Sequence, residues 1–414
     1  MENVYYSLKD FELSLKKNAI ERADDFQQYI NQLNEFGCKS YWITSQTGVG
    51  STMTIEGFSR PVTAFISNDY LGMSQREETK QAGIDAIIKY GTGACAAQVI
   101  GGYLDIHQQL EQEIASFVGQ EDAILFSSGF GANAGILRAL LGQNDIALVD
   151  PYIHTSAMAG LKGTNVKRIG HNDLEYLEKT LKETKDQYQT RLVIIDGVYS
   201  QDGDLSLLPE IISLCKTHEA MLMLDDAHGI GVMGANGRGT AEHFNCLGQV
   251  DIITGTFSKS FGCVGGFAAA SKKIIQYLKF YADSNVFSAA PTPQVTASIL
   301  KALEIIKKEP AIRARLWENT DYLRSRLTTE GFDIGKSVSP IFPIMIRDNK
   351  KVYEIAKMLQ EKGIFTIGIV YPAVRTKEAR LRVSVLATHE HEQLDALINA
   401  LNDINKDIKI KKEQ

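Results

Sequence analysis

The stretch Met221-Leu222-Met223-Leu224-Asp225-Asp226-Ala227-His228 places an aspartate at the end of an apolar run and a histidine three residues later. Similar apolar runs occur at residues 123–126, 146–149, 192–195, 252–254 and 266–269, and amphipathic segments separate them at 107–117, 174–184 and 208–218. Strands that are apolar throughout and alternate with helices predict an α/β fold with a mostly parallel sheet covered by helices. Such sheets bind ligands at the carboxyl ends of their strands, which is where Asp225 is expected.

Around this centre, the 414-residue chain is too long for one small core and is predicted to divide into three zones. Residues 1–60 form an N-terminal arm, with a charged helical pattern from Asp10 to Phe36 followed by short strands. Residues 61–300 form a large ligand-binding domain. Residues 301–414 form a smaller α+β domain, which follows a long helix expected from Val295 to Lys308.

The composition excludes several classes of protein. With a net charge of −6, the chain has no basic excess for binding nucleic acid. Its five cysteines are odd in number and scattered, which favours a reduced, cytoplasmic setting over a disulfide framework. The N-terminus lacks the pattern of a signal peptide, and no apolar run approaches the ~20 residues of a transmembrane helix. His389-x-His391 has no third ligand at a suitable spacing, so no metal site is expected.

A second motif, Gly255-Thr256-Phe257-Ser258-Lys259-Ser260, carries one lysine in a turn rich in hydroxyl groups. Taken alone, Asp225 is better explained as a turn cap, His228 as a satisfied turn histidine and Lys259 as a surface lysine. Together they match what pyridoxal phosphate requires: a lysine for the Schiff base and an aspartate for the pyridinium nitrogen. Hydroxyls and backbone N–H groups would hold the phosphate.

Further motifs accompany these two between about Ser67 and His389. They read S-N-D-Y-L-G at 67–72, G-T-G at 91–93, F-S-S-G-F at 126–130, D-G-V-Y-S at 196–200, D-D-A-H-G at 225–229 and G-T-F-S-K at 255–259. Their order resembles that of the α-oxoamine synthases, a branch of the fold-type I pyridoxal phosphate enzymes. Within this family, residues 256–260, 302–306, 317–322 and 387–389 are most similar to the bacterial serine palmitoyltransferases.

The resemblance implies a role for each matching residue. Lys259 would form the Schiff base and act as base and acid at the substrate α-carbon, with Asp225 at the pyridinium nitrogen and His228 at the phenolic oxygen. His154 would stack on the cofactor ring and orient the substrate. The remaining cofactor contacts would come from Gly129, Phe130, Ser200, Thr256, Ser258 and, from the partner subunit of a homodimer with shared active sites, Thr292. Asn68 and Arg382 would bind the carboxylate of the amino acid, a task that suits an arginine fork.

The activity that the resemblance implies is the decarboxylative condensation of an amino acid with an acyl thioester. L-Serine and a long-chain acyl-CoA or acyl carrier protein would give a 3-ketosphinganine-like aminoketone, the first step of a sphingolipid-type synthesis. Cysteate, glycine or alanine as the donor, an aminotransferase, and a non-catalytic binding protein remain open alternatives.

The chain departs from the family pattern at Ala96-Ala97-Gln98, Tyr103 and Arg375. Arg375 and Arg380 are interpreted as surface charges. A sharper hypothesis is that Arg375 binds an acidic substrate side chain, such as the sulfonate of cysteate.

Overall fold

The computed structural model describes residues 17–38, 40–371 and 373–411. The chain forms two compact units. Unit 1 combines Met1–Ser67, Gln201–Gly203 and Leu316–Gln414, and unit 2 combines Asn68–Ser200 and Asp204–Arg315. The zones expected at 1–60, 61–300 and 301–414 stay predictions.

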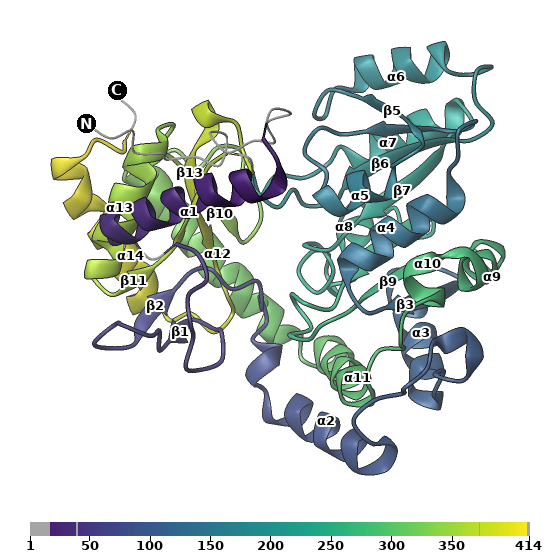
Figure 1. Cartoon of the computed structure of the whole chain (residues 1–414), viewed down its shortest axis with the longest axis horizontal. Helices are drawn as coiled ribbons and strands as arrows, with labels where there is room; N and C mark the ends of the chain where they lie inside the picture. Colours follow the sequence, from purple (N-terminus) through teal and green to yellow (C-terminus); the bar gives the residue numbers. More distant parts are fainter. Residues whose placement is uncertain (1–16, 39, 372, 412–414) are drawn as a thin grey trace. The chain divides into compact units, whose positions relative to one another are not determined.

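Unit 2 is built on a seven-stranded sheet with the strand order β3-β9-β8-β7-β6-β4-β5 (Figure 1). The strands are β3 (Asp122–Phe126), β4 (Ile146–Val149), β5 (Asn165–Arg168), β6 (Arg191–Asp196), β7 (Met221–Asp225), β8 (Ile252–Thr256) and β9 (Gly266–Ala270). Strand β9 runs antiparallel to both of its neighbours, β3 and β8, and the other adjacent pairs of the sheet are parallel. The mostly parallel sheet is therefore confirmed, and each of the six apolar runs is a strand. Strand β5 was not predicted, because its sequence Asn-Val-Lys-Arg is largely polar and it lies exposed at the sheet edge.

Helices connect these strands and pack on the sheet. They are α2 (Glu77–Tyr90), α3 (Asp105–Val118), α4 (Gly129–Leu140), α5 (Thr155–Gly160), α6 (Leu174–Glu183), α7 (Leu208–Thr217), α8 (Thr240–His243), α9 (Lys272–Tyr281), α10 (Asp283–Val286) and α11 (Pro293–Lys308). The core joins α4, α5 and α9 to the sheet through side chains such as Ile136, Ala157 and Leu278. The predicted helix at 295–308 is confirmed as α11, and Pro293 occupies its first turn, where a missing N–H costs nothing.

Unit 1 contains two small sheets. Their orders are β1-β2-β11 and β10-β13-β12, with the strands β1 (Thr52–Met53), β2 (Val62–Ala64), β10 (Ile341–Met345), β11 (Ile364–Phe365), β12 (Ile367–Ile369) and β13 (Arg380–Ser384). Its helices are α1 (Ala19–Phe36), most of α12 (Pro310–Thr329), α13 (Asn349–Glu361) and α14 (His391–Asp407). The helix expected from Asp10 therefore begins at Ala19 in the described residues, and residues 10–16 lie outside them.

Strand β13 corrects one interpretation made from the sequence. Arg380 was read as a surface charge, but its side chain is only 2% exposed and its Nη1 lies 2.6 Å from Asp202 Oδ1. Its Nε donates to the carbonyl oxygen of Glu378 at 2.7 Å. The interpretation was wrong because the alternation Arg-Leu-Arg-Val also fits a strand with one face in water, whereas every residue of β13 is buried.

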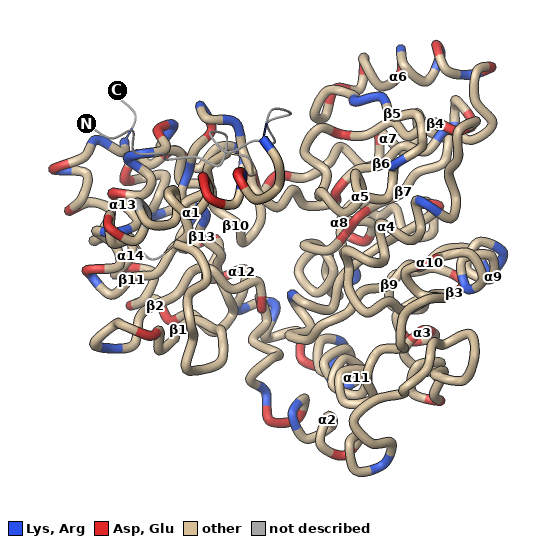
Figure 2. The backbone as a smooth tube through the Cα atoms, in the orientation of Figure 1, with Lys and Arg blue, Asp and Glu red and all other residues tan. Residues whose placement is uncertain are grey.

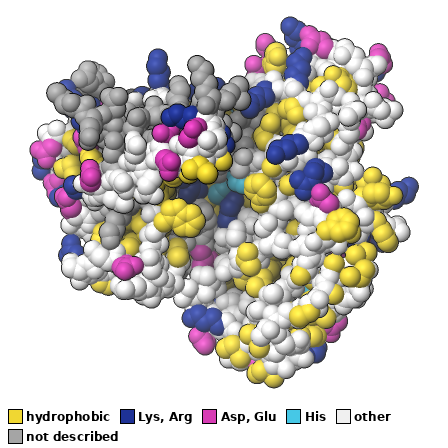
Figure 3. Space-filling model, in the orientation of Figure 1, with side chains coloured by type: hydrophobic (Ala, Val, Ile, Leu, Met, Phe, Trp, Pro, Cys, Tyr) yellow, Lys and Arg dark blue, Asp and Glu magenta, His cyan; other side chains and the backbone are white. Residues whose placement is uncertain are grey.

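The surface carries both signs of charge. Lys and Arg alternate with Asp and Glu along the described parts of both units (Figure 2), which is not the basic face of a nucleic-acid-binding protein. Apolar side chains are spread over the visible surface (Figure 3), and those on α9 include Tyr277, Phe280 and Tyr281. Among the described residues, no helix is both long and apolar enough to span a bilayer.

Candidate active site

A cavity of about 260 Å³ lies at the carboxyl ends of β6, β7 and β8 in unit 2. It is lined by Ser128, Gly129, Phe130, Asn133, His154, Ser156, Asp196, Val198, Ser200, Asp225, Ala227, His228, Gly255, Thr256, Ser258 and Lys259. Every predicted cofactor-binding residue except Thr292 is in this lining. The sheet therefore gathers side chains that lie up to 131 positions apart, from Ser128 to Lys259.

Asp225 ends β7 and is held by neutral donors. Its Oδ2 accepts from Asn133 Nδ2 at 2.6 Å, and its Oδ1 accepts from the backbone N–H of Ala227 at 3.1 Å. The Asn133 amide also reaches Ser156 Oγ at 2.9 Å, and its Oδ1 has no hydrogen-bond partner among the described residues. Asp225 is 6% exposed, and these two bonds fix the orientation of its carboxylate in the cavity.

His154 lies between β4 and α5, at the start of the short helix. Its Nδ1 is 2.6 Å from Ser156 Oγ, and its backbone N–H donates to Asp196 Oδ1 at 3.4 Å. Burial lowers the pKa of His154, and the neighbouring Lys259 lowers it further while Asp225 opposes the shift. A neutral imidazole at this position can stack on an aromatic ring without adding charge.

Asp196 and Asp225 are opposite each other in the register of β6 and β7. Burial raises the pKa of Asp196 well above its ordinary value, and the nearby charge of Asp225 raises it further. Two carboxylates this close do not both ionise readily. Both causes favour the neutral form of Asp196.

His228 is linked to Asn68 through a residue for which the sequence indicated no role. The hydroxyl of Tyr70 lies 2.8 Å from His228 Nδ1 and 3.4 Å from Asn68 Oδ1. Tyr70 is 1% exposed and lies within the S-N-D-Y-L-G motif. Its contact with His228 spans 158 positions, so no local pattern predicts it.

Two hydroxyl groups and the N-terminus of a helix line the cavity together with Lys259. Thr256 Oγ1 lies 2.8 Å from Ser258 Oγ and donates to the carbonyl oxygen of Gly265 at 2.9 Å. Helix α4 begins next to this turn at Gly129, and a Cβ placed there would come within 2.9 Å of Thr256 Cβ. The close approach brings a helix N-terminus to the two hydroxyls, an arrangement that suits a phosphate group.

Three predicted site residues, Asn68, Arg382 and Thr292, lie outside this lining. Asn68 Oδ1 lies 3.4 Å from the Tyr70 hydroxyl, which links it to His228. Arg382 lies on β13 of unit 1, where its Nη1 donates to Ser384 Oγ at 2.8 Å. Thr292 precedes α11, and its carbonyl oxygen accepts from Thr296. Their contacts with substrate and cofactor stay predictions.

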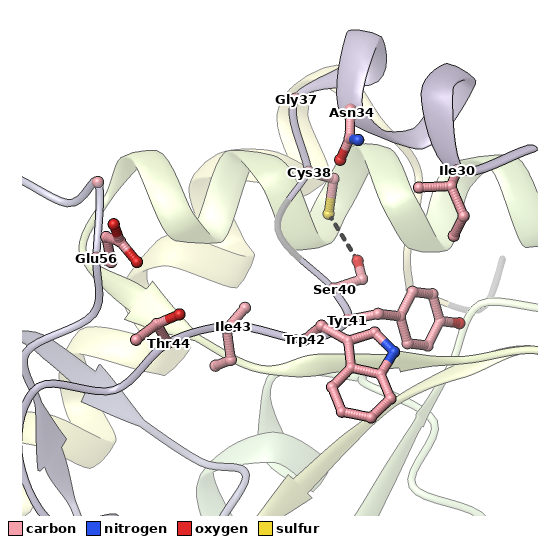
Figure 4. Close-up of a pocket in the computed structure, with 11 residues that line it drawn as sticks. Ile30, Asn34, Gly37, Cys38, Ser40, Tyr41, Trp42, Ile43, Thr44 and Glu56 are labelled. Carbon is pink, nitrogen blue, oxygen red and sulfur yellow. Dashed lines mark hydrogen bonds between the residues drawn. The ribbon is translucent and has the colours of Figure 1, made fainter. Parts of the chain in front are cut away.

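Unit 1 has a larger hollow, of about 610 Å³, lined by residues between Ile30 and Gly57 (Figure 4). Cys38 Sγ lies 3.2 Å from Ser40 Oγ there, and burial raises the pKa of the thiol, so the sulfur is not an activated thiolate. Among its described lining residues there is no lysine or histidine to serve as a base. The lysine, histidine and aspartate side chains that could act in catalysis line the smaller cavity of unit 2.

Comparison with known proteins agrees with this geometry. Residues 60–401 match the model of the family "Aminotransferase class I and II". The chain is 40% identical to the serine palmitoyltransferase of Sphingobacterium spiritivorum over 95% of its length and 98% of that protein. The chain is an α-oxoamine synthase of this family.

Two further relatives bear on its activity. The 8-amino-7-oxononanoate synthase of Thermoanaerobacter pseudethanolicus is 38% identical, over 95% of this chain and all of that protein. The solved structure of Sphingomonas wittichii serine palmitoyltransferase is 28% identical, with a TM-score of 0.90 over 96% of this chain and all of that one. The enzyme is therefore a pyridoxal phosphate-dependent acyltransferase.

The residues present fit this cofactor. The Asp225 carboxylate, held by Asn133, suits a protonated pyridine nitrogen, and the imidazole of His154, whose pKa is lowered by burial, suits stacking. The unpartnered Asn133 Oδ1 and the hydroxyls beside the α4 N-terminus are polar groups that a bound ligand can satisfy.

Proposed function

We propose that the enzyme condenses L-serine with a long-chain acyl thioester, with loss of carbon dioxide, to give a 3-ketosphinganine-like aminoketone. This reaction would begin a sphingolipid-type synthesis in the cytoplasm. The similarity of the whole fold carries the proposal. Solved serine palmitoyltransferases reach TM-scores of 0.90 over 94–96% of this chain, whereas an 8-amino-7-oxononanoate synthase from Francisella tularensis reaches 0.71 over 84%.

In this proposal the bound cofactor supplies an electron sink for a carbanion at the amino acid α-carbon. Lys259 holds the cofactor through Nζ and moves the proton at that carbon. Asp225 keeps the pyridine nitrogen protonated, supported by its bond from Asn133. His228, held by Tyr70, contacts the phenolic oxygen.

The other predicted residues bind and orient. His154 stacks on the cofactor ring, with Ser200 beside it. The phosphate is held by Thr256, Ser258 and the N-terminus of α4 with Gly129 and Phe130, and by Thr292 from the partner subunit of a homodimer. Asn68 and Arg382 hold the substrate carboxylate, which decides when decarboxylation occurs.

Reduction with borohydride followed by peptide mapping tests the assignment of Lys259. The cofactor label should appear on the peptide that contains Lys259, and the Lys259→Ala variant should give no labelled peptide. A label on another lysine would overturn the assignment.

The donor is tested with a matrix of serine, glycine, alanine and cysteate against acyl-CoA and acyl carrier protein substrates. Carbon dioxide and the mass of the aminoketone are measured for each pair. Serine with a long-chain acyl donor should give the largest kcat/KM. If amino transfer to a keto acid occurs without carbon dioxide release, an aminotransferase is the better assignment.

A second candidate is the reaction of the 8-amino-7-oxononanoate synthases. It is favoured by the 38% identity to the Thermoanaerobacter enzyme, which is close to that of the serine palmitoyltransferases. In the same matrix it predicts that alanine and a short acid-terminated acyl thioester are the preferred pair.

A further inference from the structure

His171 lies between two carboxylates near the cavity but outside its lining. Its Nδ1 is 3.0 Å from Asp150 Oδ2, and its Nε2 is 2.9 Å from Asp204 Oδ2. A carboxylate oxygen can only accept, so an imidazole bonded to one at each nitrogen must carry both protons. The geometry thus describes a cation between two anions, with side-chain exposures of 22% for His171, 2% for Asp150 and 12% for Asp204.

These residues belong to three neighbouring strand ends. Asp150 follows β4 directly, His171 follows β5, and Asp204 lies in the connection after β6. Strand β4 is paired with both β5 and β6, so the three connections lie side by side at one edge of the sheet. The His171 ring also packs on Tyr152 at 4.6 Å and, edge-on, on Tyr199 at 4.5 Å between centroids.

Two of these connections carry residues that line the cavity. The β4 connection leads from Asp150 to His154. Within it, the backbone N–H of Tyr152 donates to Asp150 Oδ1 at 2.9 Å. The β6 connection folds back on itself, with the Tyr199 N–H donating to the carbonyl oxygen of Asp204 at 3.0 Å, and Ser200 lies within this fold. A bond from His171 to each aspartate fixes both connections against each other.

We propose that His171 is a positioning residue: by bridging Asp150 and Asp204, it holds the connection that carries His154 in place beside the connection that carries Ser200. Without this bridge, two largely buried carboxylates would face each other, and their repulsion would separate the connections. His154 would then shift relative to the cofactor ring. This inference rests on the proposed roles of His154 and Ser200, and not on which amino acid is the donor.

The test compares His171→Asn with His243→Asn in the holoenzyme. His243 is an exposed histidine of α8 whose ring packs on Phe244, and it serves as a matched control within the same unit. The circular dichroism of the bound cofactor reports its orientation, and a spectral titration gives the dissociation constant for L-serine without an acyl donor. His171→Asn should weaken the cofactor signal and lower kcat/KM by about 10²-fold, the usual effect of a misplacement of about 1 Å, whereas His243→Asn should match the parent.

Two further measurements keep the proposal falsifiable if His171→Asn folds poorly. In the parent, nitrogen NMR should show both ring nitrogens of His171 protonated at pH 7; a neutral ring would overturn the proposal. In a His171→Gly variant, added imidazole should restore the cofactor signal at pH 6, where it is largely cationic, and should fail to restore it at pH 9.

The outcomes separate this inference from the proposed function. If the parent forms no borohydride-stable adduct at Lys259, the proposed function fails. If the parent does form it but His171→Asn has the cofactor signal and serine affinity of His243→Asn, only the positioning role is refuted.

Discussion

Replacing either partner of the buried Arg380–Asp202 ion pair should destabilise unit 1, and by different amounts. The guanidinium bonds to Asp202 Oδ1 and to the carbonyl oxygens of Gln201 and Glu378 at 2.6, 3.1 and 2.7 Å. The Arg380 side chain is 2% exposed, whereas that of Asp202 is 32% exposed. Asp202 can therefore be hydrated when Arg380 is replaced, whereas Arg380 cannot be hydrated when Asp202 is replaced.

The magnitudes follow from this asymmetry. Asp202→Asn leaves a buried cation without its counter-charge, which costs about 3–5 kcal/mol in comparable pairs. Arg380→Met removes the buried charge, retains apolar volume and leaves Asp202 partly hydrated. The free energy of unfolding should therefore fall only by about the contribution of the lost hydrogen bonds, about 1–3 kcal/mol. A difference of about 2 kcal/mol corresponds to about 4–8 °C in the Tm of a unit of this size.

Tryptophan fluorescence is the appropriate assay, because both tryptophans of the chain, Trp42 and Trp317, belong to unit 1. The control is Glu354→Gln on α13, whose carboxylate pairs with Lys350 at 3.7 Å between side chains that are 32% and 57% exposed. Such a pair contributes about 0–1 kcal/mol. If Arg380→Met lowered the Tm as much as Asp202→Asn, the argument from unequal burial would be refuted.

Three further predictions concern unit 2 and the substrate. Tyr70→Phe leaves His228 Nδ1 without its hydroxyl partner and should weaken pyridoxal phosphate binding by roughly tenfold in equilibrium dialysis; unchanged affinity would contradict this. Burial lowers the pKa of His171, but its two aspartates raise it more, to about 9. Because the native state binds this proton more tightly than the unfolded chain, the stabilisation is complete below pH ~6.5 and is lost as the pH rises from there through the native pKa of about 9. The Tm of unit 2 should fall over this range in the parent and in His243→Asn, and stay level in His171→Asn. If Arg375 binds an acidic side chain, Arg375→Ala should reduce the kcat/KM ratio of cysteate to serine by about tenfold, and an unchanged ratio would exclude that role.

The sheet could be predicted because six of its strands are apolar runs, buried on both faces. Strand β5 lacks this signal, since only one neighbour pairs with it and most of its side chains are exposed. Its presence follows from pairing with β4, a tertiary contact that the residues Asn165–Arg168 do not encode by themselves.

The site residues likewise fall into those that the sequence predicts and those that only the fold reveals. The rule that ligands bind at strand ends, together with the motif resemblance, predicted Asp225, His154 and Lys259 as site residues, and all three line the cavity. Asn133 and Tyr70 were missed as partners, because their bonds to Asp225 and His228 span 92 and 158 positions. Such residues look like ordinary helix and motif positions until the fold brings their partners to them.

Three aspartates at adjacent strand ends show why hydrogen-bond partners that the sequence does not predict are important. Asp150, Asp196 and Asp225 end or follow β4, β6 and β7, so three carboxylates converge on one edge of the sheet. Asp150 pairs with His171, and burial and Asp225 raise the pKa of Asp196 well above its ordinary value. Asp225 lines the cavity and accepts from the side-chain amide of Asn133 and the backbone N–H of Ala227. The surrounding residues thus give three identical side chains three different sets of partners, and they fix the Asp225 carboxylate in the cavity, where a protonated pyridine ring would bind.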